Sequence, residues 1–486
     1  MASNAGPAGR HEQLRSKLAP IGQEHLLAFW DRLSEPERAT LARQIDEIDP
    51  ELFLELQAEY RESAKQSEQS KWSALAARAK SPPAMRLDGS GVSFSREAAH
   101  SRGAELLAAG QIGMILVAGG LGTRLGLDQP KGMFRLAPLS QRSLFQIIIE
   151  QLLAVSRAYG VRIPLYVMTS PATDAVTRTY LDEHRWFGLP SEDSHVFCQA
   201  TMWAVDSAFE RILLETPGSL FLGPDGHGGM LSAFAKSGCL ADAQQRGIQH
   251  IFYGQIDNPL LQVCDELFLG SHALAASEMT TQVVQKRDPL ERVGNVVAID
   301  GKVQVIEYSD LPADSARQTN PDSSLQLWAG NLAVHAFSLP FLARVAQQRR
   351  ALPFHYARKK VACLDAAGST VEPEKPNAVR FERFIFDLLP QAAQALVVEA
   401  DPAQAFAPVK NSDREATDNP RTARAMMMAQ ARDWLRAAGA QIGVQTPVEI
   451  NPLWARNAAE VKLRLPTGTV IDEPTYFSPA GPRVFA

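Results

Sequence analysis

The feature that most constrains the fold is an alternation of short apolar runs with amphipathic segments between residues 112 and about 400. The runs include GMILVAGG, IPLYVMTS, HVFCQA and QHIFYGQIDN, and SLFQIIIEQLLAVSRAYG is an amphipathic segment of helical type. Strands that alternate with helices predict an α/β fold with a mostly parallel sheet. Asp300-Gly301 lies within VVAIDGKVQVIEYS, between two alternating runs, and predicts a β-hairpin. The sheet is therefore expected to be mixed.

A helical N-terminal region is expected over residues 1–108. Ser34, with Glu37 three residues later, has the spacing of a capping box, and the helix that follows is expected to end before Pro50. The stretch KSPPAMRLDGSG is rich in Pro, Gly and Ser, which is typical of a connector. A further helix, capped by Ser95, is expected after it.

A small α+β region is expected over residues 401–486. It contains a helical pattern, NPRTARAMMMAQARDWLRAAGA, followed by the strand-like piece AEVKLRLPTGTVID. A chain of 486 residues is too long for one ordinary core. We therefore expect three parts, the N-terminal region, a central domain over residues 109–400 and this C-terminal region.

Composition excludes several classes of partner. A net charge of −5 over 486 residues gives no general attraction to nucleic acid or anionic lipid, so an anion site must be built locally. The chain contains no run of about eighteen apolar residues, and its N-terminus lacks the apolar core of a signal peptide. Four widely spaced cysteines favour buried, reduced thiols. A cytoplasmic protein with no nucleic-acid or membrane partner is expected, as a monomer or weak homo-oligomer.

A glycine-rich stretch, LVAGGLGTRLGLDQPKG over residues 116–132, follows one of the strand-like runs. Glycine-rich turns between a strand and a helix bind phosphates, because glycine lets the backbone approach an anion closely. Arg124 and Lys131 add positive charge, and the lysine lies beyond the loop, from where it can reach back over a phosphate. A tight turn with two surface cations is the alternative interpretation.

Two common phosphate-binding patterns do not fit this stretch. The Rossmann fingerprint fails because the third glycine is displaced and no acidic residue ends a second strand at the expected distance, which argues against a nicotinamide-dependent oxidoreductase. The P-loop fails because no Gly-Lys-Ser or Gly-Lys-Thr occurs here. A G-x-G-T-R motif followed by Pro-Lys at 130–131 remains.

This combination resembles the signature of nucleotidyltransferases that join a nucleoside triphosphate to a sugar 1-phosphate. Further pieces extend the resemblance over residues 112–425 to the eukaryotic-type UDP-sugar pyrophosphorylases, and above all to their N-acetylhexosamine branch. In chain order they are CQA, GPDGHGG, QIDNPL, QVVQKRDPLERVGNVV, VIEYSD, WAGNLAVHAF, KPNAVRFERFIFDLLP, FAPVKNSD and DNPRTAR. The resemblance implies a Rossmann-like, GT-A-like nucleotidyltransferase domain that forms a UDP-sugar and pyrophosphate from UTP and a hexose 1-phosphate.

The resemblance assigns roles at the nucleotide and the metal. Its nucleotide-binding positions are Gly119, Gly120, Gly122, Thr123, Gln199 and Gly226. A glutamine amide such as that of Gln199 can pair with the uracil edge. Arg124 and Lys131 hold the leaving pyrophosphate, and Lys410 holds the sugar phosphate and the α-phosphate. Asp257 follows a strand-like run, where ligands meet α/β sheets, and is the expected Mg²⁺ ligand. The alternatives are a helix cap for Asp257 and a surface position for Lys410.

The sugar pocket is less sharply defined. Its implied residues are His227, Gly294, Glu307, Asn331, Phe384 and Phe386. Phe381, Phe384 and Phe386 have a spacing that also fits a buried helical face. The N-acetylhexosamine branch usually has asparagine where this chain has His227, whereas the glucose-specific branch has Gly-His-Gly. N-acetylglucosamine 1-phosphate or N-acetylgalactosamine 1-phosphate is the expected substrate, with glucose 1-phosphate or a broad set as the alternative.

The expected chemistry needs no general base. A sugar phosphate is already anionic, so positioning two anions and stabilising charge on the α-phosphate are sufficient for catalysis. A regulator without catalytic activity that keeps only the fold is the alternative of a different class. The presence of Arg124, Lys131, Asp257 and Lys410 together argues against it, because a binding relic does not need all four.

Overall fold

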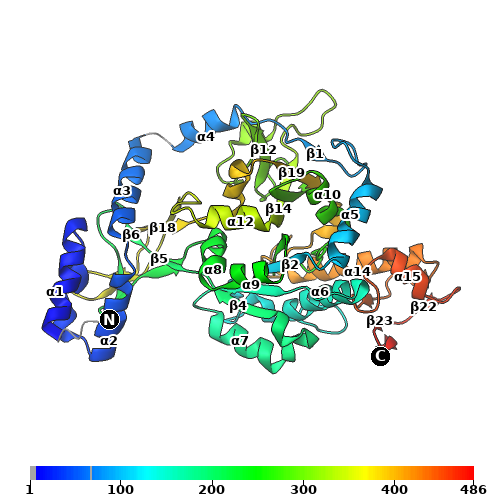
Figure 1. Ribbon diagram of the computed structural model, residues 1–486, viewed down its shortest axis with the longest axis horizontal. Helices are drawn as coiled ribbons and strands as arrows, with labels where there is room; N and C mark the ends of the chain where they lie inside the picture. The colour runs from blue at the N-terminus through cyan, green and yellow to red at the C-terminus, as the bar shows by residue number, and fades with distance from the viewer. Residues whose placement is uncertain (1–6, 66–67, 486) are drawn as a thin grey trace. The chain divides into compact units, whose positions relative to one another are not determined.

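The computed structural model describes residues 7–65 and 68–485, and the chain folds as two compact units (Figure 1). Unit 1 and unit 2 are each formed by several separate stretches of the chain. Unit 1 comprises the described residues up to 74 together with 200–229 and 352–384; unit 2 comprises the described residues of 75–199, 230–351 and 385–486.

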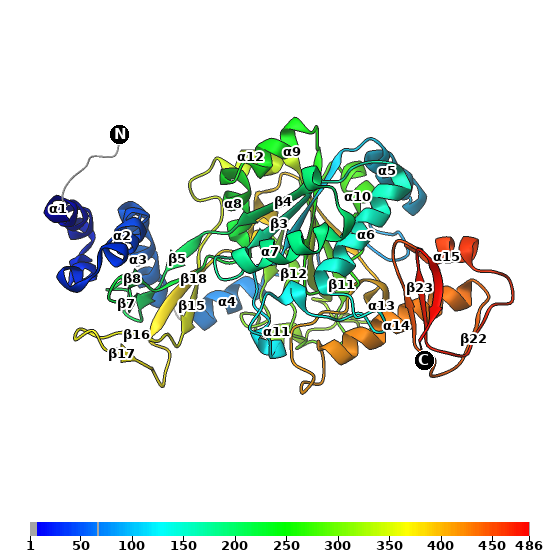
Figure 2. The same cartoon turned by 90° about the horizontal axis from the view of Figure 1, so that it is seen from below.

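Unit 1 packs helices from the start of the chain against strands from its middle (Figure 2). Its helices include α1 (Pro7–Leu18), α2 (Glu35–Asp46) and α3 (Pro50–Lys65), and its three-stranded sheet contains β6 (Val205–Asp206), β15 (His355–Lys359) and β18 (Ala378–Glu382). Tyr60 on α3 contacts Phe209 and Tyr356, with ring centroids 5.5 and 5.4 Å apart respectively. The predicted capping box of α2 is confirmed, because Glu37 accepts from the Ser34 backbone N–H at 2.8 Å and Ser34 caps the helix in return.

Unit 2 is built around a mixed sheet, as the sequence predicts. The strands follow the order β1-β19-β11-β14-β10-β2-β3-β4. The pairs β10–β2, β2–β3, β3–β4, β11–β19 and β1–β19 are parallel, and only β14 joins this order through antiparallel pairs. The strands span Ala84–Met85 (β1), Ile112–Val117 (β2), Leu165–Thr169 (β3), Ser194–Cys198 (β4), His250–Gln255 (β10), Met279–Gln285 (β11), Ala329–Ser338 (β14) and Ala395–Glu399 (β19).

The predicted hairpin is confirmed. β12 (Asn295–Ile299) pairs antiparallel with β13 (Lys302–Ile306). Asp300 and Gly301 form the turn with φ values of 51° and 80°. Both residues lie in the left-handed region, which is the geometry that Asp-Gly favours in a two-residue hairpin turn.

Helices cover the sheet of unit 2, and two of them cross closely. α5 (Arg96–Ala108) packs against α10 (Glu266–Leu274). A Cβ at Gly103 would overlap the Glu266 carbonyl, and one at Gly270 would overlap that of Ala99, so the crossing requires glycine on both helices. α6 (Leu144–Tyr159) buries an almost continuous apolar face in the same core. The predicted Ser95 cap of α5 is confirmed, and the connector before it contains the short strand β1, which the sequence did not indicate.

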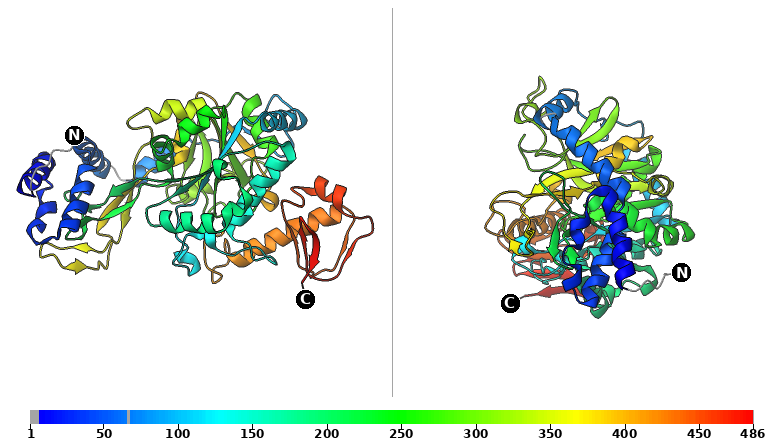
Figure 3. Two further views of the ribbon diagram at one scale, coloured as in Figure 1. Left: turned by 60° about the horizontal axis from the view of Figure 1, so that its bottom comes forward. Right: turned by 90° about the vertical axis from the view of Figure 1, so that its left-hand side faces the viewer.

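The C-terminal part of unit 2, which includes the orange helix and red strands of Figure 3, has a small core of its own. It contains α14 (Pro420–Ala437), α15 (Ala458–Arg464), β21 (Val448–Ile450), β23 (Thr475–Ser478) and β24 (Gly481–Val484). The strand-like interpretation of AEVKLRLPTGTVID is wrong over its first half, which forms α15. Val461 and Leu465 are buried four residues apart, whereas Leu463 is 86% exposed, so the helical period overrides the apparent alternation.

The units divide the chain differently from the three parts that the sequence predicts. Unit 1 combines part of the N-terminal region with residues 200–229 and 352–384, and residues 75–108 and 401–486 belong to unit 2. Side chains from separate stretches form each core, and sequence texture does not reveal such long-range packing. Among the described residues no helix is long and apolar enough to cross a membrane. All four cysteines are free thiols, and two of them are buried.

Acid sensitivity is expected from two histidines buried in unit 2. The rings of His250 and His272 lie 5.0 Å apart, and burial lowers their pKa values to about 4 and about 3. Between pH 6.5 and 4 the unfolded chain binds protons that the folded chain excludes, so stability falls as the pH is lowered. Each histidine should cost about 2 kcal/mol of unfolding free energy on going from pH 7.5 to pH 5.

Urea unfolding of the wild type and of His272→Gln at both pH values measures this effect. The variant should lose less stability than the wild type on acidification. The variant is needed because the wild type alone does not isolate the histidine effect. Burial raises the pKa of Asp265 to about 6, so protonation of this carboxyl group makes the folded chain more stable as the pH is lowered. Equal losses in the two proteins would exclude His272 as a source of acid sensitivity.

Candidate active site

The glycine-rich loop after β2 closes on itself. The Gly122 N–H donates to the Gln129 carbonyl at 2.8 Å, and the Lys131 N–H donates to the Gly120 carbonyl at 3.0 Å. A short 3₁₀ turn, η4 (Thr123–Leu125), lies between these two contacts and ends at Gly126, whose φ is 77°. The backbone of Lys131 is therefore fixed directly against the glycines.

The glycines of the loop differ in whether a side chain would fit at their position. A Cβ at Gly119 would lie 3.2 Å from the Ser170 backbone nitrogen, and one at Gly122 would lie 3.0 Å from the Leu127 Cβ. Both distances are too short to accommodate without movement, so these two glycines permit the folding of the loop. Gly120 is exposed, with open space where its Cβ would stand. Its backbone is accessible to a ligand, as the phosphate-binding interpretation requires.

The structure brings four of the predicted charged residues into one electrostatic neighbourhood. Burial is the main cause that lowers the pKa of Lys131; Asp257 opposes this effect, whereas Lys410 and Arg124 reinforce it. β2 and β10 are parallel neighbours, with Val117 opposite Gln255, so the loop and Asp257 emerge at the same edge of the sheet. The expected strand-end position of Asp257 is confirmed.

Lys410 is tied to Asp257 through the backbone. The Val409 N–H donates to the Asp257 carbonyl at 2.8 Å, and the Lys410 N–H donates to that of Asp418 at 2.7 Å. The neighbouring Asn258 is buried and donates its side chain to the Ala405 carbonyl at 2.7 Å. Residues 153 positions apart in the chain are thereby held side by side, since 410 and 257 differ by that number.

Asp418 is a member of this cluster that sequence reasoning missed. Burial raises the pKa of its carboxyl group; Lys410 opposes this effect, whereas Glu291 and Asp257 add to it. The DNPRTAR motif was informative for the helix that starts at Pro420, and the aspartate before it carried no separate signal. Among the described residues no group of three or more His, Cys, Asp or Glu side chains could hold a metal ion. Asp257 and Asp418 nevertheless supply the oxygen donors that Mg²⁺ prefers, and Mg²⁺ commonly combines one or two carboxylates with substrate phosphates and water.

Three predicted sugar-binding residues lie together in unit 2. A Cβ at Gly294 would lie 3.1 Å from Glu307 Oε1 and 3.7 Å from the Asn331 Cβ. The Asn331 N–H donates to the Gly294 carbonyl at 2.8 Å. Gly294 thus leaves space beside a carboxylate and an amide, two groups that bind sugar hydroxyls well.

The buried Lys286 supports this group and was also missed. Its Nζ donates to Asn295 Oδ1 at 2.5 Å and to the Pro289 carbonyl at 3.4 Å. Burial lowers its pKa, and the carboxylates of Glu291 and Asp288 oppose that shift. The lysine therefore fixes the loop that carries Gly294, although in the sequence it looks like any surface cation.

Gly226, His227 and Phe384 form a separate group in unit 1. The Gly228 N–H donates to the Arg383 carbonyl at 2.8 Å, and a Cβ at Gly226 would overlap the same carbonyl. The ring of His227 stacks on Phe384 with centroids 5.4 Å apart, and His355 contacts Phe384 at 4.5 Å. Burial, with a smaller contribution from His355, lowers the pKa of His227 to about 4, so the imidazole is neutral near pH 7.

The remaining predicted residues occupy varied positions. Gln199 is buried directly after β4, and its backbone N–H donates to the Thr169 carbonyl at 3.0 Å. Phe381 and Phe386 are buried as expected, but the predicted helical face is wrong. Phe381 lies in β18, and Phe386 lies in the 3₁₀ segment η9 (Ile385–Gln391). A strand followed by a tight turn produces the same spacing of buried rings as a helix.

A comparison with protein families matches residues 51–444 to the family described as UTP–glucose-1-phosphate uridylyltransferase. The match covers both the glycine-rich loop and the segment that carries Lys410.

Individual relatives point to a narrower branch. The chain is 34% identical to the UDP-N-acetylhexosamine pyrophosphorylase-like protein 1 of Xenopus tropicalis, over 88% of this chain and 85% of that protein. It is 35% identical to the UDP-N-acetylglucosamine pyrophosphorylase of Saccharomyces cerevisiae, over 72% and 75% respectively. The solved structure of the uridine diphosphate N-acetylglucosamine pyrophosphorylase of Trypanosoma brucei is similar with a TM-score of 0.79 and 25% identity, over 96% of this chain and 98% of that one.

Proposed function

Because this chain belongs to the UTP–glucose-1-phosphate uridylyltransferase family and is a UTP:sugar-1-phosphate uridylyltransferase, we propose that its sugar substrate is N-acetylglucosamine 1-phosphate. The names of its relatives in Xenopus tropicalis and Saccharomyces cerevisiae support this substrate. The arrangement of Arg124, Lys131, Asp257 and Lys410 at one sheet edge supports the site of the chemistry. The catalytic roles proposed for these four residues rest on this arrangement.

The proposed reaction is an in-line displacement at the α-phosphorus of UTP. A phosphate oxygen of the sugar 1-phosphate forms the new P–O bond while the bond to pyrophosphate breaks, so no proton needs to be removed from the nucleophile. We assign Lys131 and Arg124 to the departing pyrophosphate, and Lys410 to the sugar phosphate and the α-phosphate. Their charge, held next to a backbone loop, stabilises the equatorial oxygens in the transition state.

Mg²⁺ is the proposed cofactor, bound by Asp257 and, as a second carboxylate, Asp418. When bound, the ion would neutralise negative charge on the substrate phosphates. Asp257 is fixed by its own carbonyl, which accepts from Val409. This contact ties the backbone of the proposed metal ligand Asp257 to the residue before Lys410.

Gly294, Glu307 and Asn331 of unit 2 are assigned to the sugar. His227, which lies in unit 1, stays a separate predicted sugar-binding residue. Uracil is assigned to Gln199 with the Gly120 backbone, and Phe384 and Phe386 would border the acyl group. The neutral imidazole of His227 can both donate and accept a hydrogen bond, as an asparagine amide can, but its ring is larger. Glucose 1-phosphate, or a broad range of sugars, is the second candidate because the motif around His227 is Gly-His-Gly.

A panel of sugar 1-phosphates assayed for pyrophosphate release with UTP tests the substrate. We expect the highest kcat/KM with N-acetylglucosamine 1-phosphate, and we expect His227→Asn to raise the ratio of this value to the glucose 1-phosphate value by about 10-fold, the scale of one well-placed contact. His25→Asn, in the same unit, serves as the control. The same ratio in wild type and His227→Asn would exclude His227 from sugar selection.

The panel also tests the alternative of another class. UTP binding without turnover of any sugar 1-phosphate would indicate a regulator without catalytic activity. The cytoplasmic location and the monomeric or weakly oligomeric state stay predictions.

A further inference from the structure

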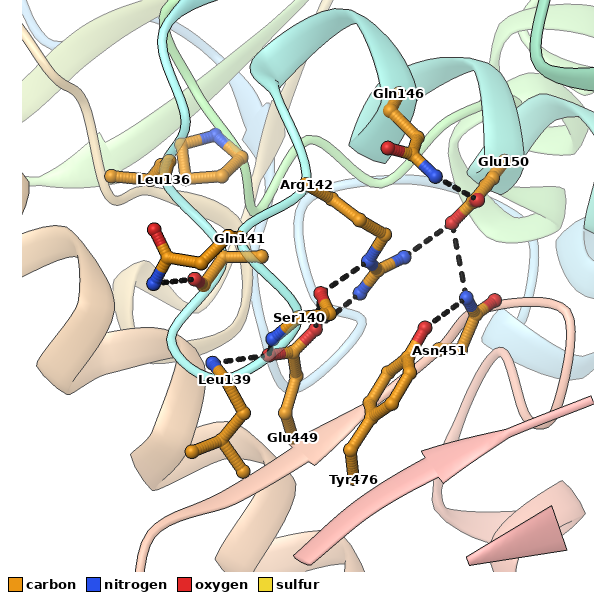
Figure 4. A network of polar contacts seen from close by, with 12 residues as sticks. Leu136, Leu139, Ser140, Gln141, Arg142, Gln146, Glu150, Glu449, Asn451 and Tyr476 are labelled. Atoms are coloured by element: carbon orange, nitrogen blue, oxygen red, sulfur yellow. Dashed lines mark hydrogen bonds and ion pairs between the residues drawn. The ribbon is translucent and has the colours of Figure 1, made fainter. Parts of the chain in front are cut away.

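A buried ionic network joins the C-terminal part of unit 2 to the start of α6 (Figure 4). Arg142 is 5% exposed and forms ion pairs with Glu150 on α6 and with Glu449 on β21, the latter at 2.7 Å. Asn451 donates to Glu150 Oε2 at 3.0 Å and to the Tyr476 hydroxyl at 2.7 Å. A guanidinium buried in this way is stable only with its carboxylates in place.

Glu449 is bound by more than Arg142. Its Oε2 accepts from the backbone N–H groups of Leu139 and Ser140 at 2.7 and 2.9 Å, and its Oε1 accepts from the Ser140 hydroxyl at 2.5 Å. The Ser140 hydroxyl in turn accepts from Arg142 Nε at 2.9 Å. One carboxylate of the C-terminal part thus fixes the tip of the loop that spans residues 134–143.

This loop leads directly back to Lys131. The Phe134 N–H donates to the Lys131 carbonyl, and the Leu144 N–H donates to the Phe134 carbonyl, both at 3.0 Å. A Cβ at Gly132 would overlap the Phe145 ring, so the backbone next to the lysine is packed directly against this ring. A displacement of the loop tip is therefore transmitted to the backbone of Lys131.

Packing does not hold the network on all sides. A pocket of about 190 Å³ borders it, lined by Arg142, Glu449, Ile450, Trp434 and the segment 259–263. The pocket is lined largely by apolar side chains that do not include Leu139 or Ser140, so hydrogen bonds to Glu449 hold the loop tip in place.

We propose that Glu449 is a positioning residue for Lys131, so that the C-terminal part of unit 2 sets the geometry of the lysine at the departing pyrophosphate. This inference rests on the proposed role of Lys131. It gives the part of the chain from α14 onward a place in catalysis although none of the residues there is assigned to a substrate.

A second anchor of the C-terminal part provides a matched control. Arg456 pairs with Glu266 of α10 at 3.0 Å and with Glu460 at 2.7 Å. This anchor connects to α10 and not to the loop of residues 134–143. Glu266→Gln should therefore loosen the attachment of the C-terminal part without displacing Lys131.

The test compares steady-state kinetics of Glu449→Gln and Glu266→Gln in the full chain. We expect Glu449→Gln to lower kcat/KM for UTP about 10-fold and to leave KM for the sugar 1-phosphate within twofold. Glu266→Gln should leave both within twofold, with urea unfolding midpoints recorded for each protein. Ser140→Ala, which removes only the bridging hydroxyl, should show a smaller loss of the same kind and serves as the readout should Glu449→Gln not fold.

A double-mutant cycle separates positioning from a general structural effect. In the Lys131→Ala background, the second substitution Glu449→Gln should cause no further loss, because the residue that it positions is gone. The inference would be overturned if the losses of rate in Lys131→Ala and Glu449→Gln multiplied in the double variant. It would also be overturned if Glu449→Gln and Glu266→Gln had the same kcat/KM for UTP. A wild-type rate for Lys131→Ala alone would instead overturn the proposed role of Lys131, so the two failures are distinguishable.

Discussion

Replacing Lys131 by alanine is expected to lower kcat by about 100- to 1000-fold, which is the usual cost of removing one charge-stabilising group from a transition state. The lysine is partly buried next to Arg124, Lys410 and Asp257, and burial lowers its pKa. A partly desolvated cation interacts strongly with phosphate oxygens because little water screens it. Removing it from the free protein relieves repulsion from two other cations, so the fold should persist.

Single-turnover rates and near-ultraviolet circular dichroism of Lys131→Ala measure the two parts of this expectation. Arg135→Ala is the matched control, because Arg135 is an exposed cation only four residues further along the chain. The control should retain more than half of the wild-type rate. A folded Lys131→Ala enzyme that works as fast as the control would remove the lysine from the catalytic assignment.

Replacing Asp257 by asparagine is expected to lower kcat by about 1000-fold at low millimolar Mg²⁺. The side chain keeps its size but loses the negative charge that a hard divalent cation requires. The charge also offsets the lowering of the Lys131 pKa, so its loss lowers that pKa further.

A Mg²⁺ titration of the reaction rate separates these contributions. Asp257→Asn should need a much higher Mg²⁺ concentration for half-maximal rate, whereas Asp128→Asn, an exposed carboxylate of the glycine-rich loop, should not. An unchanged Mg²⁺ requirement in Asp257→Asn would show that the aspartate does not bind the metal.

The sequence predicted most of the residues in the charged cluster because each lies in a local pattern. Lys131 stands at the end of a glycine-rich loop and Asp257 at the end of an apolar run. The parallel pairing of β2 and β10 then brings the two together, and an α/β pattern already implies that strands end at one edge. Asp418 was missed because Asp257 and Glu291, which contribute to its surroundings, are distant in the sequence. Lys286 was missed because its contacts depend on how residues 288–295 fold back onto it, and no local pattern signals that fold.

By itself the sequence determined the α/β class, the hairpin at Asp300-Gly301, the glycine-rich loop and the charged residues to look for, because all of these depend on the order of neighbouring residues. Only the tertiary structure decided the division into two units, the helix at Ala458–Arg464 and the buried network of Arg142 and Glu449. These features depend on which surfaces become buried and on pairs of charges some 300 residues apart, as in the Arg142–Glu449 contact with a separation of 307. A sequence does not show which distant charges will pair. In the folded chain they are in contact because a buried charge requires a partner.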